Sequence, residues 1–139
     1  MGKEEGSLPF QPRADDPLLG RLVDEATDDT VNVEVTTVDS FMEKHSVPGI
    51  MILKTDTEGN ELDVLAGARK SLGAGLIQSV LVETSPWPRN RRHVALRDLL
   101  DFLTPLGFDL HGLYDPGFRS DGSMSFCNAL FVRRGGAKG

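Results

Sequence analysis

Apolar and polar side chains alternate along the middle of the chain with the periods of strands and helices. Residues 31–35 alternate apolar and polar, which predicts a half-buried strand. Residues 50–53 form a continuous apolar run, which predicts a strand buried on both faces. The apolar stretch at 77–82 predicts the next strand, and residues 108–113 and 128–132 are two further candidates.

Between these strands the apolar residues recur at helical spacing. Asp39 or Ser40 is the expected cap of a short helix, because Ser40 and Glu43 fit a capping box. A second helix is expected over residues 61–72, where the apolar side chains share one face and a glycine follows. Leucines at helical spacing predict a third helix over 96–106.

The order of these elements predicts an α/β fold. Strands that alternate with helices form βαβ units and a mainly parallel sheet. The last two strands are joined by residues 114–126, which are rich in Gly, Pro, Asp and Ser and show no helical pattern. Because a parallel pair needs a long crossover, we expect an antiparallel strand at the end of the sheet.

Residues 31–133 are the expected folded domain. Residues 1–30 are acidic and interrupted by Gly and Pro, so we expect weak order there. Residues 134–139 are expected to be a disordered tail.

Composition narrows the classes of partner and compartment. The 139 residues carry a formal net charge of −6, which argues against nucleic-acid binding and against an anionic membrane surface. Cys127 is the single cysteine, so no intramolecular disulfide forms, and we expect it to be a small buried residue. No apolar run is long enough for a membrane span and no targeting signal stands out, so the default expectation is a cytoplasmic protein.

Acidic residues follow two neighbouring strands of the predicted sheet. Lys54, Asp56 and Glu58 lie where the apolar run at 50–53 gives way to a helix, and Glu83 ends the next strand. In an open α/β sheet, ligands bind at the carboxyl ends of strands, so we expect these side chains in one crevice. Such carboxylates can hold a hard cation, orient a hydroxyl and accept its proton, or favour a nearby sulfonium cation.

Each of these residues also has a structural interpretation. Glu58 and Glu61 could merely complement the N-terminus of the following helix. Lys54 could pair with Glu83, because a charge on a buried strand needs a partner. His93 is interpreted as a surface residue at a helix start rather than a base.

Two stretches of the chain resemble the FkbM methyltransferase family. The first is residues 37–41, Thr-Val-Asp-Ser-Phe, which matches the family's threonine-leucine-aspartate. The second is residues 52–68, which read Ile-Leu-Lys-Thr-Asp-Thr-Glu-Gly-Asn-Glu-Leu-Asp-Val-Leu-Ala-Gly-Ala. The family pattern there is leucine-lysine-isoleucine-aspartate-x-glutamate-glycine-x-glutamate-x-x-valine-leucine-x-glycine-alanine. Val38 and Thr55 are mild departures from these patterns.

The resemblance implies a Rossmann-like class I methyltransferase fold with strand order 3-2-1-4-5-7-6 and the last strand antiparallel. Residues 50–55, 77–83, 108–113 and 128–132 would be strands 4, 5, 6 and 7. It also implies S-adenosyl-L-methionine as cofactor and O-methylation of a small-molecule or sugar hydroxyl. Asp56, Glu58, Glu83 and Lys54 become the predicted catalytic residues. Asp56, Thr57 and Gly59 become the predicted cofactor contacts, with Asp56 and Glu83 as candidate ligands of a divalent metal.

One feature of the family pattern is missing. Residues 1–30 contain no counterpart of the glycine-rich turn after strand 1, so we expect a truncated domain with strands 4-5-7-6 and weak cofactor binding. Strand 4 would then have an unpaired edge that invites self-association. Two other functions fit the same residues: a non-catalytic module that docks through this edge, and a metal-dependent phosphate-handling domain.

Overall fold

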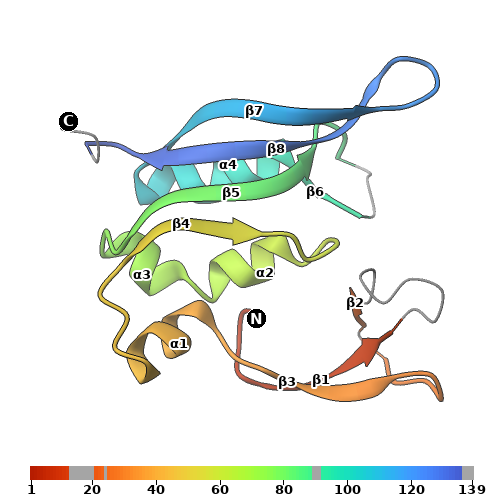
Figure 1. Cartoon of the computed structure of the whole chain (residues 1–139), viewed down its shortest axis with the longest axis vertical. Coiled ribbons are helices and arrows are strands. Elements are labelled where there is room, and N and C mark those ends of the chain that lie inside the picture. Colours follow the sequence, from red (N-terminus) through yellow and green to blue (C-terminus); the bar gives the residue numbers. More distant parts are fainter. Residues whose placement is uncertain (13–20, 24, 89–91, 136–139) are drawn as a thin grey trace.

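The computed structural model describes residues 1–12, 21–23, 25–88 and 92–135, and its strands form two sheets (Figure 1). The smaller sheet is antiparallel, in the order β2-β1-β3. β1 (Gly6–Gln11) lies between β2 (Arg21–Leu22) and β3 (Val31–Val35). β3 confirms the predicted strand at 31–35, whereas β1 lies in a segment for which the sequence predicted little order.

The larger sheet has the order β4-β5-β8-β7, from β4 (Ile50–Thr55) and β5 (Ile77–Ser85) to β8 (Met124–Arg133) and β7 (Phe108–Phe118). β4 and β5 are parallel, and β8 is antiparallel to both β5 and β7. A short strand, β6 (Val94–Ala95), pairs in parallel with the end of β5. The predicted mixed α/β architecture is therefore confirmed, as is the order 4-5-7-6 that the family resemblance implied for these four strands.

The connection between the last two long strands differs from the prediction. Residues 114–126 were expected to be an irregular loop, but β7 and β8 extend so far that only residues 119–123 lie outside the two strands. Register shifts between Leu110 and Gly112 and between Tyr114 and Gly117 allow β7 to continue past its glycines. Bulges of this kind keep a strand paired where the alternation of side chains breaks down, so the pattern alone did not reveal it.

The first helix, α1 (Val38–Lys44), begins earlier than predicted. Its cap is Thr37, whose extended backbone precedes the helix and whose Oγ1 accepts a hydrogen bond from the Ser40 amide at 3.0 Å. The prediction of Asp39 or Ser40 as cap was wrong because both residues are already inside the helix.

The predicted helix over 61–72 is in fact two short helices, α2 (Glu61–Ala66) and α3 (Arg69–Gly73). Asp39 stabilises the break from the neighbouring helix. Its amide donates to the Gly67 carbonyl at 2.9 Å, and its carboxylate accepts from the amides of Lys70 and Ser71, both at 2.9 Å. Those two amides would otherwise lack partners, because the first turn of a helix has no carbonyls to bond.

Replacing Asp39 tests this capping role. We expect Asp39→Ala to lower the free energy of unfolding by about 1–2 kcal/mol, the usual effect of losing a helix cap. Asp39→Asn keeps one carbonyl oxygen as an acceptor, so it should lose less. Urea denaturation followed by circular dichroism measures both, and equal stability of wild type and Asp39→Ala would contradict the assignment.

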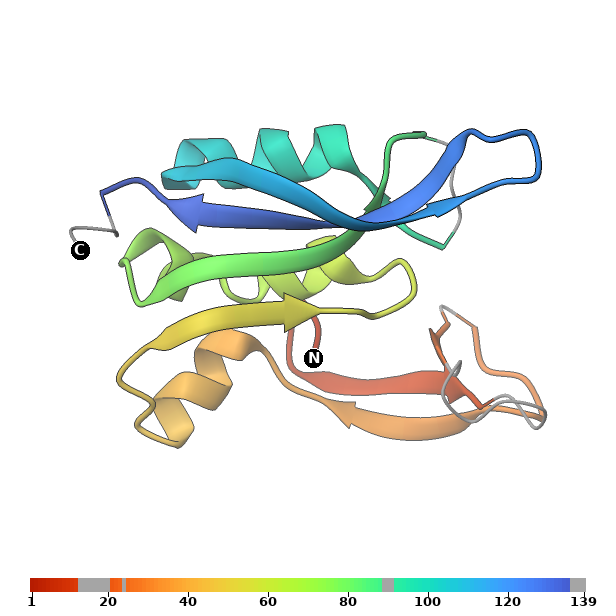
Figure 2. The same ribbon diagram turned by 45° about the horizontal axis from the view of Figure 1, so that its top comes forward.

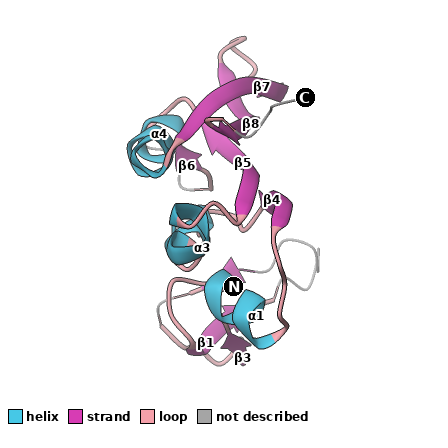
Figure 3. Cartoon of the chain, turned by 90° about the vertical axis from the view of Figure 1, so that its left-hand side faces the viewer, coloured by secondary structure: helices cyan, strands magenta, loops and turns pink. Residues whose placement is uncertain are grey.

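The helices pack one continuous core against a single face of the larger sheet (Figures 2 and 3). The predicted third helix is present as α4 (Leu96–Leu103), extended by a 3₁₀ turn over Thr104–Leu106 and closed by Gly107 at φ 88°. The core side chains from helices and strands are fully buried and include Leu65, Leu72, Val80, Leu99 and Phe131. Cys127 is also buried, as predicted. Its burial, and to a smaller extent the negative charge of Glu83, raises the pKa of its thiol.

The prediction that residues 50–53 are buried on both faces was wrong. Met51 is 76% exposed and Ile52 is 60% exposed, because within the described residues β4 pairs with β5 alone. Self-association through this edge stays a prediction.

Several sequence expectations fall wholly or partly outside the described residues. These include the order of residues 13–20 and 24 and of the tail at 136–139. The domain boundaries at 30 and 133 stay predictions. Among the helices that the structure does describe, none has the length and apolar character needed to cross a membrane.

Candidate functional site

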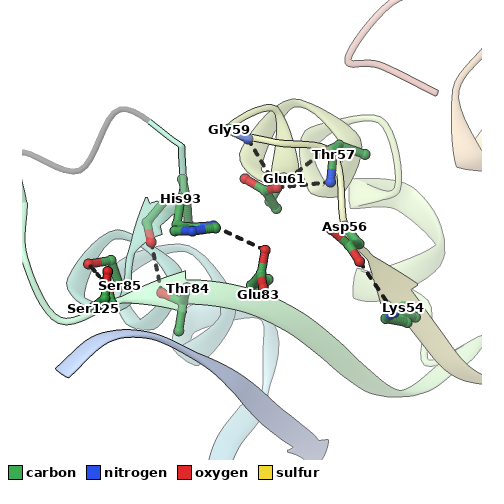
Figure 4. Close-up of polar contacts among 11 residues, drawn as sticks. Lys54, Asp56, Thr57, Gly59, Glu61, Glu83, Thr84, Ser85, His93 and Ser125 are labelled. Carbon is green, nitrogen blue, oxygen red and sulfur yellow. Dashed lines mark hydrogen bonds and ion pairs between the residues drawn. The ribbon is translucent and has the colours of Figure 1, made fainter. Parts of the chain in front are cut away.

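The carboxyl ends of β4 and β5 bring Asp56 and Glu83 to the same edge of the sheet. Thr55 is the partner of Val82 in the parallel register, so Asp56 and Glu83 follow at the same level. Figure 4 shows the two carboxylates on neighbouring segments, with Glu83 between Asp56 and His93. Asp56, Glu58 and Glu61 lie near enough for their negative charges to act on Glu83.

The turn between β4 and α2 is held by a buried glutamate. Glu61 is fully buried, and its Oε1 accepts hydrogen bonds from the Thr57 amide at 3.0 Å, the Gly59 amide at 3.1 Å and the Thr57 hydroxyl at 3.3 Å. The turn needs this support because Glu58 adopts φ 52°, a conformation that costs a non-glycine residue energy. Gly59, at φ 108°, occupies a position that favours glycine.

Lys54 and Asp56 form an ion pair on the exposed side of this turn. Their charged atoms are 3.4 Å apart, and about half of each side chain or more is exposed. The alternative that Lys54 pairs with Glu83 was therefore wrong. An exposed pair of this kind contributes little stability. Because both side chains are exposed, both groups are accessible to a ligand.

Glu83 instead faces His93. The Nδ1 atom of His93 is 3.1 Å from Oε2 of Glu83, and the two side chains are only 11% and 19% exposed. The distance is that of an ion pair, although the imidazole does not point straight enough at the oxygen for a hydrogen bond. The interpretation of His93 as a surface residue was wrong, because the segment before α4 folds back against β5 as β6.

The environment of Glu83 raises the pKa of its carboxyl group. Burial is the main cause, because it removes water from the ionised form. His93 acts in the opposite direction, while the charges of Asp56, Glu58 and Glu61 raise the pKa further. Since the folded pKa lies above the unfolded one, protonated Glu83 stabilises the fold at acidic pH, and this contribution is lost as the pH rises through the raised value.

Replacing His93 tests this description of Glu83. We expect His93→Phe to raise the pKa of Glu83 above its wild-type value, because the group that favours the ionised carboxylate is gone. NMR titration of the side-chain carboxyl carbons measures it. A pKa that falls or stays the same in the variant would mean that His93 does not act on Glu83.

The structure gives no support to a metal at Asp56 and Glu83. Across the described ranges, no three His, Cys, Asp or Glu side chains gather in a way that could hold a metal ion. The amides of Thr57 and Gly59, two predicted cofactor contacts, donate to Glu61. Any contact that these residues make with a ligand therefore has to use other atoms.

Two residues of this site went unrecognised in the sequence. Glu61 was interpreted as a helix-end charge, yet its spacing of four from Thr57 and two from Gly59 is what lets it bond back to the turn. For His93 the available signal was weak: a histidine directly before the two-residue apolar stretch Val94–Ala95, which pairs with β5.

The chain matches a known protein family over most of its length. The family described as Methyltransferase FkbM domain matches residues 2–110, which include β1, the whole β4–α2 turn and β5. No curated protein and no solved structure is significantly similar to the chain.

Proposed function

Because the chain belongs to the FkbM methyltransferase family, we propose that it forms the acceptor side of an S-adenosyl-L-methionine-dependent O-methyltransferase. The substrate in this proposal is a hydroxyl group of a small molecule or sugar. The observation that carries the proposal is the convergence of Asp56, Glu58 and Glu83 at the carboxyl ends of two parallel strands. Ligand sites of open α/β sheets lie at this edge.

The strand order supports a Rossmann-like class I fold. β4, β5, β8 and β7 take the places of strands 4, 5, 7 and 6, and β8 is the antiparallel strand. In this assignment the turn at Asp56–Asn60 follows strand 4 and Glu83 lies near the end of strand 5. Both therefore face the cofactor and acceptor region of the proposed domain.

The charges at this edge fit a cationic cofactor. When bound, S-adenosyl-L-methionine supplies a methyl group carried on a sulfonium cation. The raised pKa of Glu83 reflects burial and the negative charge of its neighbours, and negative charge favours a cation nearby. We assign Asp56, Thr57 and Gly59 to the cofactor side of the turn.

The acceptor side is built from the same residues. Asp56 and Glu58 present oxygen atoms that can accept a hydrogen bond from a hydroxyl and orient its oxygen toward the methyl group. Lys54 donates a hydrogen bond to Asp56 at 3.4 Å and so helps to hold that carboxylate in place. Orientation and charge placement are the main contributions that residues of this kind make to a transfer reaction.

We further propose that the chain alone binds the cofactor weakly. Within the described residues, the strands preceding β4 form an antiparallel sheet, and no strand leads through a glycine-rich turn into a helix there. Calorimetric titration of the 139-residue chain with S-adenosyl-L-methionine is expected to show affinity weaker than micromolar. Micromolar affinity or tighter would contradict this part of the proposal.

A further inference from the structure

His93 is held beside Glu83 by strand pairing, which fixes its position more firmly than a loop would. Thr84 pairs with Val94 and Ser85 with Ala95 in parallel register, so the preceding residues, Glu83 and His93, lie level with each other. The Thr84 hydroxyl also donates to the Val94 carbonyl at 2.8 Å, which fastens β6 to β5 (Figure 4).

The surroundings of the imidazole favour one tautomer of the neutral ring. Nδ1 is 3.1 Å from Glu83 Oε2, and the ring packs against Phe126 with 5.3 Å between centroids. Of the two neutral tautomers, a carboxylate beside Nδ1 favours the one with hydrogen on Nδ1, which leaves the lone pair of Nε2 available to accept a proton. A carboxylate orients the histidine base of hydrolytic triads in the same way.

We propose that His93 Nε2 accepts the proton of the methyl acceptor and that Glu83 is the residue that positions it. The inference rests on the proposed O-methyl transfer. The acceptor oxygen forms its bond to the methyl carbon, the bond from that carbon to sulfur breaks with its electron pair left on sulfur, and the hydroxyl proton moves to Nε2.

The structure favours His93 over the carboxylates for this step. Asp56 is half exposed and its carboxylate already pairs with Lys54, whereas an imidazole is a side chain suited to proton transfer near neutral pH. The imidazolium produced would be stabilised by Glu83, whose Oε2 is 3.1 Å from Nδ1.

Nitrogen-15 NMR of the histidine rings in the 139-residue chain tests the positioning without cofactor. At a pH where the ring is neutral, His93 should carry its hydrogen on Nδ1. Glu83→Ala should shift it toward the Nε2–H form, while Glu83→Gln, which keeps an acceptor oxygen, should preserve the wild-type form. His45 and His111 provide internal controls. A dominant Nε2–H form in the wild type, or no change in Glu83→Ala, would overturn the inference.

The catalytic role is tested in a full-length family member that has glutamate and histidine at these two positions. Replacing the histidine with phenylalanine should lower kcat by about 100-fold or more, the range for loss of a general base, with little change in KM for the cofactor. A normal kcat in the variant would overturn the role of His93 as the base, but not the proposed methyltransferase function. Absence of hydroxyl methylation by the wild-type enzyme would instead overturn the proposed function, and the tautomer measurement would still stand.

Discussion

Glu61→Ala is expected to lower the free energy of unfolding by about 3 kcal/mol, because it removes a buried acceptor of three hydrogen bonds and leaves their donors unpaired. Oε1 of Glu61 accepts three hydrogen bonds from the turn: two from the amides of Thr57 and Gly59, and one from the Thr57 hydroxyl. With the carboxylate gone, Glu58 would also lose the support for its φ of 52°. Chemical denaturation of both proteins measures the difference.

Glu61→Gln is the matched control. It keeps the volume and one acceptor oxygen, so the amides of the turn retain their partner. Oε2 of Glu61 has no hydrogen-bond partner in the described part of the chain, so an amide nitrogen at that position breaks no existing hydrogen bond. We expect Glu61→Gln to be clearly more stable than Glu61→Ala. Equal stability of the two variants would show that the turn does not depend on this acceptor.

Asp56→Asn in a full-length FkbM methyltransferase is expected to lower kcat by about 100-fold, the usual effect of removing one preorganised electrostatic contact. The substitution keeps the shape of the side chain and removes the negative charge that orients the acceptor and favours the sulfonium. In this chain Asp56 is half exposed at the strand end, so the fold should tolerate the change. Initial rates of methyl transfer from labelled cofactor provide the measurement.

Asp63→Asn is the control for this experiment, in a family member that also has aspartate at this position. Asp63 is an exposed acid on α2, five residues after Glu58, and belongs to the same stretch of the family match. Its replacement changes net charge by the same amount without touching the strand ends. Normal activity in Asp56→Asn, or an equal loss in both variants, would refute the specific role of Asp56.

Hydrophobic periodicity was sufficient to predict the central strands, whereas their order in the sheet was implied by the family resemblance. The apolar runs at 50–53 and 77–82 became β4 and β5, and the absence of a helix between 113 and 128 correctly indicated an antiparallel pair. Periodicity could not show that Asp39 caps a second helix far along the chain, because that bond depends on packing between α1 and α3. The break between α2 and α3 was missed for the same reason.

The candidate site was predicted only in part, for a similar physical reason. Strand ends can be located from the apolar pattern, so the sequence alone could assign Asp56 and Glu83 to one edge of the sheet. Which residue each carboxylate pairs with depends on the directions of the side chains and on the position of β6. This strand has only two residues, too few to show an apolar pattern in the sequence. Lys54 therefore paired with Asp56, and Glu83 paired with His93.

Acidic residues from two neighbouring strands, Asp56 and Glu83, lie close together at this edge of the sheet. The pKa of Glu83 responds to the charge of Asp56, so measuring it tests that arrangement. The negative charge of Asp56 is one cause of the raised pKa, after burial and the opposing effect of His93. Carboxyl-carbon NMR titration of the 139-residue chain should therefore show a lower pKa for Glu83 in Asp56→Asn than in the wild type. An unchanged pKa would contradict the account, because it would place the two carboxylates too far apart to share a site.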